Sequence, residues 1–130
     1  MSDLMILAHA GSWEMRFQVS ALAASAAAAG EQVEIALFFA ALDCWAGGRW
    51  DALDPAPPVS VQRLEALGLP PLSDLLAPGR QTGAIRIYAC SASGRILGLD
   101  QARLQESVDA VLGWQTLSRK TATAGRVVSF

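Results

Sequence analysis

Apolar residues in this chain form short continuous runs that alternate with stretches of helical periodicity. Such runs are typical of strands covered on both faces, and four of them predict strands at Leu4–Ala8, Val33–Phe39, Ile85–Ala89 and Arg126–Phe130. Strands separated by helices favour parallel pairing with right-handed crossovers. We therefore expect residues 1–130 to form a single domain, an α/β protein with three α/β/α layers and a mainly parallel sheet of roughly four to five strands.

The longest helical pattern lies between the first two strands. Ser12 is the expected N-cap of a helix from about Trp13 to Ala29, and Gly30 is the expected left-handed residue that ends it. The apolar residues with helical spacing predict one buried face, which consists of Met15, Val19, Leu22 and Ala26.

The second strand is followed by Ala40–Pro58, which contains paired glycines, three prolines and two tryptophans. This composition predicts a long loop with a helical turn at its start. Cys44 lies in it, close to the carboxyl end of the strand, and burial under the two tryptophans is the simplest role for that thiol.

Three further segments show helical signals. Ser60 is the expected cap of a short helix that ends at Gly68, and a second helical turn, Leu72–Ala77, is closed by Pro78 and Gly79. Asp100 is the expected N-cap of a third helix, with Gly113 as its stop. The apolar stripe predicted for this third helix consists of Leu104, Val108, Val111 and Leu112. Gln115–Thr123 is then a short connection to the last strand.

Composition restricts the partners. The chain has 10 basic and 12 acidic residues without a basic cluster, which disfavours nucleic acid and anionic membrane surfaces as partners. Because 52% of the residues are hydrophobic and 17% charged, we expect a homo-oligomer, with Trp45, Trp50 and Trp114 as an exposed cluster. No apolar run approaches the ~20 residues of a membrane span and no secretory signal is evident, so we expect a cytoplasmic protein.

The segment Ile85–Asp100, IRIYACSASGRILGLD, carries the strongest chemical signal. It predicts a buried strand that delivers Cys90 to the start of a helix, where backbone N–H groups favour a reactive thiolate. A small apolar core residue is the alternative for Cys90, since free cysteine is among the most buried residue types. The hydroxyl and N–H groups of Ser91 and Ser93 are the nearest candidate donors to its sulfur.

Parallel strands place their carboxyl ends at one edge of the sheet, where ligands bind in open α/β folds. Two other groups are expected at this edge, namely His9, Gly11 and Ser12 after the first strand, and Cys44 and Trp45 after the second. His9 is either a structural hydrogen-bonding residue or a group coupled to the Cys90 thiolate. Two distant cysteines and one histidine offer no metal-ligand spacing, and no cofactor motif is present, so we expect neither a metal nor a cofactor.

Several of these features together resemble the DsrE/DsrF-like family. They are Val33–Phe39 preceded by Gly30, the segment IYACSASGRILGLD, Gly113 with Thr116 and Leu117, and the ending VVSF. The resemblance implies a small α/β protein that assembles as a homo- or hetero-oligomer. It also implies an intracellular sulfur carrier that holds a persulfide on Cys90 and exchanges sulfur with donor and acceptor proteins.

Two other functions remain open at this point. The same strand ends could hold a small anionic ligand in an oligomeric binding module, with Cys90 only lining the pocket. Alternatively, a thiol redox protein could use Cys44 as its resolving cysteine, although no Cys-x-x-Cys motif is present. The sulfur-carrier hypothesis predicts that Cys90 reacts well ahead of Cys44.

Overall fold

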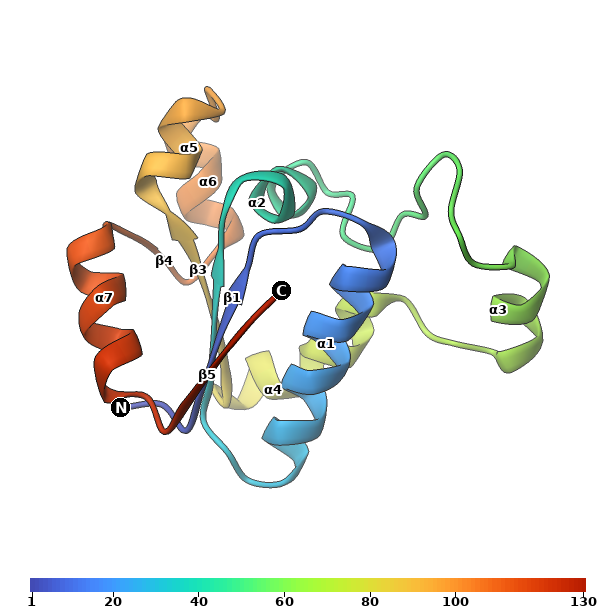
Figure 1. The fold of residues 1–130 in the computed structure, drawn as a ribbon, viewed down its shortest axis with the longest axis horizontal. Helices are drawn as coiled ribbons and strands as arrows, with labels where there is room; N and C mark the ends of the chain where they lie inside the picture. The colour runs from blue at the N-terminus through green and yellow to red at the C-terminus, as the bar shows by residue number, and fades with distance from the viewer.

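A computed structural model describes residues 1–130 and contains one five-stranded sheet in the order β4-β3-β2-β1-β5 (Figure 1). Every strand pair is parallel, which confirms the predicted α/β class. The strands are β1 Leu4–Ala8, β2 Val33–Leu37, β3 Ile85–Cys90, β4 Ala110–Leu112 and β5 Arg126–Ser129. The helices are α1 Trp13–Ala28, α2 Phe39–Ala46, α3 Val61–Leu67, α4 Leu72–Thr82, α5 Ser91–Ile96, α6 Gln101–Ser107 and α7 Trp114–Thr123.

The connectivity explains why helices cover both faces of the sheet. From β1 to β4 each strand is laid beside the previous one in the same direction, and α1 and α4 pack together on one face. The chain then returns from β4 at one edge to β5 at the other through α7. Because parallel crossovers are right-handed, this reversal places α7 on the opposite face, as Figure 1 shows.

The two faces of the sheet have unequal cores. The larger cluster has 20 buried residues and lies under α1 and α4, whereas the smaller has five, Met5, Ala36, Phe38, Cys90 and Leu117, on the face of α7. All five residues of β2 are buried, so this central strand has no solvent-facing side. None of the helices is long and apolar enough to cross a membrane.

The segment Ala40–Pro58, predicted as a long loop with a helical turn at its start, begins with a helix of more than one turn. The second strand ends at Leu37, and Phe39–Ala46 forms the helix α2, which places Cys44 on a helix. Alanine and leucine favour this helix, and it stops where Gly47 and Gly48 begin. The glycines mark the end of the helix, and the predicted loop begins there and continues to the start of α3.

The end of the helix predicted over Leu72–Ala77 also differs from prediction. The helix α4 continues through Pro78 to Thr82, and Gly83 at φ 79° ends it. Gly79 allows α4 to pack closely on β3, because a Cβ there would lie 2.4 Å from the Cδ1 atom of Ile85.

The predicted helix after Asp100 ends at Ser107, and Ala110–Leu112 is the edge strand β4, paired with β3. A short apolar run cannot be assigned to helix or strand by periodicity alone. Gly113 is consequently the N-cap of α7 rather than a helix stop, and the segment predicted as a connection is helical.

Helix starts were predicted better than helix faces. Ser60 and Asp100 both cap their helices with side-chain oxygens, whereas Ser12 occupies the N-cap position of α1 without a side-chain hydrogen bond. Met15 and Leu22 are only half-buried. The buried residues of α1 are Trp13, Arg16, Val19, Ser20, Ala23 and Ala26. The helix α3 buries no residue and stands away from the sheet (Figure 1).

Candidate functional site

The predicted site residues follow the carboxyl ends of three adjacent strands. His9 follows β1, Phe38 and α2 follow β2, and Ser91 follows Cys90, the last residue of β3. Because β1, β2 and β3 are parallel neighbours, these residues gather at one edge of the sheet. The strand-end placement expected from the sequence is therefore confirmed. Which of these residues can contact a ligand depends on the exposure of their side chains.

A stack of aromatic rings lies at this edge. The ring centroids of His9 and Phe38 are 4.6 Å apart, and those of Phe38 and Trp114 are 5.1 Å apart. Trp114, at the start of α7, is 51% exposed, and the neighbouring Phe39 is 46% exposed. We call His9, Phe38, Phe39 and Trp114 the aromatic edge. His9 and Trp114 were expected from the sequence as candidate site and surface residues, whereas Phe38 and Phe39 were missed, although two consecutive phenylalanines at the end of a strand were the available signal.

Phe39 has an unusual backbone. Its φ of 40° lies in the left-handed region, and it is the only non-glycine residue with a positive φ. A bulky side chain rarely adopts this conformation, and residues that do so concentrate at functional sites. The strain lies at the junction between β2 and α2, beside the aromatic stack.

Cys90 is fully buried. Its exposure is 0%, and it shares the smaller core cluster with Phe38 and Leu117. The strand-end position before α5 is as predicted, but the accessible thiol is not found, because Cys90 lies inside this buried cluster. Ser91 is half-buried, and Ser93 is 1% exposed with a hydroxyl that has no hydrogen-bond partner.

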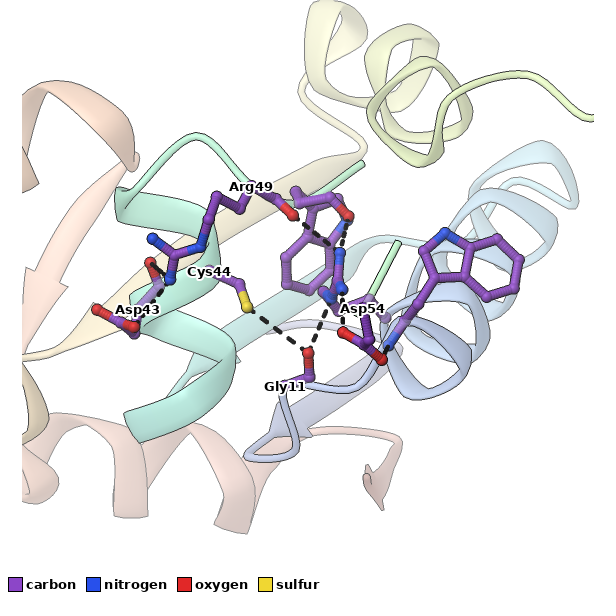
Figure 2. Close-up of polar contacts among 8 residues, drawn as sticks. Gly11, Asp43, Cys44, Arg49 and Asp54 are labelled. Atoms are coloured by element: carbon purple, nitrogen blue, oxygen red, sulfur yellow. Dashed lines mark hydrogen bonds and ion pairs between the residues drawn. The ribbon is translucent and has the colours of Figure 1, made fainter. Parts of the chain in front are cut away.

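Cys44 is half-buried and faces the loop between β1 and α1. Its Sγ atom donates a hydrogen bond to the Gly11 carbonyl oxygen at 3.6 Å (Figure 2). Gly11 is required there because a Cβ would lie 2.9 Å from the Cβ of Ala40 on α2. Cys44 packs against the larger core cluster and Cys90 belongs to the smaller, and both thiols are free. The structure thus brings Cys44 to Gly11 and does not pair the two sulfurs.

A buried arginine fixes the loop around this site. Arg16 is 2% exposed, and its guanidinium donates to the carbonyl oxygens of Gly11, Arg49 and Trp50 and to the carboxylate of Asp54 (Figure 2). The second oxygen of Asp54 accepts from the backbone N–H of Trp13 at 2.9 Å. Asp54 therefore supplies the N-terminal cap of α1 that Ser12 does not provide.

Two of the three tryptophans predicted to form an exposed cluster are structural. Trp50 is 5% exposed, and its indole nitrogen donates to the Ser20 hydroxyl at 3.0 Å. Trp45 donates to the carbonyl oxygen of Ser107 at 2.8 Å and meets Trp50 edge to face. Trp45 thus joins α2 to α6 and is not directed at a ligand, so only Trp114 remains exposed.

No group of three or more histidine, cysteine, aspartate or glutamate side chains is placed to hold a metal ion. No known family model matches the chain, and no curated protein matches it. The structure is similar to that of a protein of unknown function from Methanobacterium thermoautotrophicum, with a TM-score of 0.60 and 15% identity. The match covers 98% of this chain and 97% of that chain. At this identity the likeness shows the fold alone, a parallel α/β/α domain along the whole chain.

Proposed function

We propose that this chain is an oligomeric binding module whose copies meet through the aromatic edge. The observation that carries the proposal is Phe39, which combines a φ of 40° with a side chain that is 46% exposed. Such a conformation costs about 1–3 kcal/mol and persists where surrounding contacts compensate for it. Within one chain almost half of this side chain lacks such contacts, and a second copy supplies them.

The surroundings of Phe39 favour a protein surface as the occupant. Phenylalanine and tryptophan are enriched in interfaces, and the half-exposed Trp114 continues the stack that begins at His9. The face that carries α7 buries only five residues against 20 on the other face. A second copy is the natural partner because 52% of the residues are hydrophobic and only 17% are charged.

Sedimentation velocity of three proteins tests this assembly. The wild-type chain of 13.7 kDa should sediment as a multimer at micromolar concentration, and Trp114→Asp should sediment as a folded monomer. Leu67→Asp is the matched control, because Leu67 is 72% exposed on α3 and lies outside the aromatic edge. A monomeric wild-type protein contradicts the proposal, as does dissociation by Leu67→Asp but not by Trp114→Asp.

Sulfur carriage by Cys90 is the second candidate, and Ser93 is the observation that favours it. A hydroxyl that is buried and unpartnered, three residues after a strand-end cysteine, is an available donor to an anionic sulfur. In this reaction the Cys90 thiolate attacks the outer sulfur of a persulfide. A new S–S bond forms on Cys90, the S–S bond of the donor breaks, and the donor thiol leaves with the shared electron pair.

This second candidate requires that the buried cluster around Cys90 open, since the sulfur is inaccessible in the closed structure. Incubation with glutathione persulfide, followed by intact-mass spectrometry and peptide mapping, tests it. One added sulfur on Cys90, retained in Cys44→Ser and absent in Cys90→Ser, is the expected result. An unchanged mass, or sulfur found only on Cys44, contradicts it.

A further inference from the structure

A polar cluster lies on the face of the sheet that carries α7, apart from the aromatic edge. Glu34 on β2 and Arg86 on β3 are register partners, so both side chains lie on one face, and Tyr88 two residues later shares it. Lys120 reaches this face from α7 and donates to the Glu34 carboxylate at 2.7 Å. Its ammonium also lies 4.9 Å from the centre of the Tyr88 ring.

These groups line a cavity of about 250 Å³, whose wall also includes Ser2 and Val33. Glu34 is 8% exposed and Tyr88 is 7% exposed. Burial alone raises the pKa of Glu34, but the neighbouring Lys120, Tyr88 and Ser2 side chains outweigh it and lower that pKa. Burial and then the Glu34 carboxylate raise the pKa of Tyr88, so near neutral pH the carboxylate is charged and the phenol is protonated.

The hydroxyl of Ser2, a residue in the cavity wall, has no hydrogen-bond partner. Ser2 is 5% exposed, and the N–H of Gly125 holds its backbone carbonyl at 3.0 Å. The Ser2 hydroxyl lies near enough to Glu34 to lower the carboxyl pKa, yet it forms no hydrogen bond of normal geometry. A buried hydroxyl without a partner at the wall of a cavity is a donor available to a bound molecule.

The charges around the cavity define the kind of molecule. Arg86 is exposed and takes part in none of the salt bridges of the chain, while Lys120 is partly neutralised by Glu34. Among the side chains that line the cavity, two cations and one carboxylate leave one net positive charge. A guanidinium binds a carboxylate through two parallel hydrogen bonds, and the negative Glu34 in the wall repels a dianion. The volume is slightly below the ~300 Å³ at which sites for drug-sized ligands begin, so the occupant is small.

We propose that this cavity binds a small monocarboxylate, with Arg86 pairing with its carboxylate and the Ser2 hydroxyl donating to it. The site is independent of the assembly proposed above, because no residue of the aromatic edge lines it. It was missed in the sequence analysis, although a glutamate inside the buried run VEIAL was a signal for a functional carboxylate.

Amide NMR titration of the intact protein tests the proposal, with L-lactate as the probe and chloride at matched ionic strength as the blank. Lactate should shift the resonances of Ser2, Val33 and Tyr88 to a saturating value. Arg86→Gln should weaken binding by about tenfold or more, and Ser2→Ala by about threefold. Arg119→Gln, which removes an exposed cation of α7 that does not line the cavity, should leave the affinity unchanged.

Absence of saturable shifts at these residues overturns the proposal, and so does equal lactate affinity in wild type and Arg86→Gln. Two further probes check the class of ligand. Tighter binding of inorganic phosphate than of lactate contradicts a monoanion site. Tighter binding of an acetylated dipeptide with a free carboxylate shows that the occupant is a chain terminus and overturns the small-molecule assignment.

Discussion

Phe38, which follows β2, and Cys90, at the end of β3, share one small buried cluster in which the sulfur is closed off from solvent. The other thiol, Cys44, is half-buried. We therefore predict that exposure rather than strand-end position controls reactivity in the folded chain. The labelling order that we predict from the structure is Cys44 before Cys90, the reverse of the order expected from the sequence.

Iodoacetamide labelling followed by peptide mapping measures this order. Cys44 should be modified first in the native protein, and Cys90 only after opening. Phe38→Leu should accelerate Cys90 labelling because a smaller side chain leaves the sulfur less covered. Ile35→Val, a comparable truncation in the larger cluster on the other face, is the control and should have little effect on Cys90. Faster native labelling of Cys90 than of Cys44 contradicts this account.

Removal of the buried Arg16 guanidinium should strongly destabilise the fold. Arg16→Met leaves three carbonyl oxygens and the Asp54 carboxylate without their donor, and we expect a loss of about 3–5 kcal/mol in the free energy of unfolding. Arg63→Met on the exposed α3 should change it by less than about 0.5 kcal/mol. Urea denaturation measures both variants, and losses of equal size would show that the Arg16 network is unimportant.

Gly11 and Gly113 provide a matched test of the packing between the first loop and α2. Gly11→Ala places a Cβ at 2.9 Å from the Cβ of Ala40 and should cost about 1–3 kcal/mol. Gly113→Ala meets only the Ser91 hydroxyl oxygen at 3.7 Å, an ordinary contact. Gly113 has a φ of −82°, so alanine is tolerated there and the stability should be nearly unchanged. Thermal unfolding distinguishes the two, and the account fails if Gly11→Ala is as stable as Gly113→Ala.

The ion pair between Glu34 and Lys120 predicts a pH-dependent contribution to stability. The pKa of Glu34 lies below its ordinary value of 4.5, so the stabilisation is fully present above that value and is lost as the pH falls through the lower, folded pKa. Glu34→Gln should therefore be less stable than wild type by about 2 kcal/mol at neutral pH. The difference should shrink below pH 4.5, and a difference that grows on acidification contradicts this sign.

The sequence predicts those parts of the fold that local physics determines. The apolar runs located β1 and β3 and the start of β2, and the side chains of Ser60 and Asp100 marked two helix starts. Ser12 occupies the predicted N-cap position of α1, but the capping oxygen comes from Asp54, which is distant in sequence. β4 was taken for helix because three apolar residues carry no periodicity, and only pairing with β3 defines them.

The site was predictable in position and not in accessibility. The strand-end position of Cys90 follows from its own segment. Its burial depends on a cluster that includes Phe38 from the β2–α2 junction and Leu117 from α7, which no local pattern connects to it. Trp45 and Trp50 likewise found partners on α6 and α1, so their hydrophobicity did not indicate an exposed surface.

The central claim is that a second copy covers the aromatic edge, and the solvent access of Trp114 tests it most directly. Acrylamide quenching of wild type, corrected by the signal of Trp114→Phe, isolates this indole, which is 51% exposed in the single chain. We predict weak quenching of Trp114 in the native protein at micromolar concentration and strong quenching in Phe39→Asp, which cannot assemble. Strong quenching of Trp114 in the native wild-type protein would show that its ring is uncovered and would contradict the account.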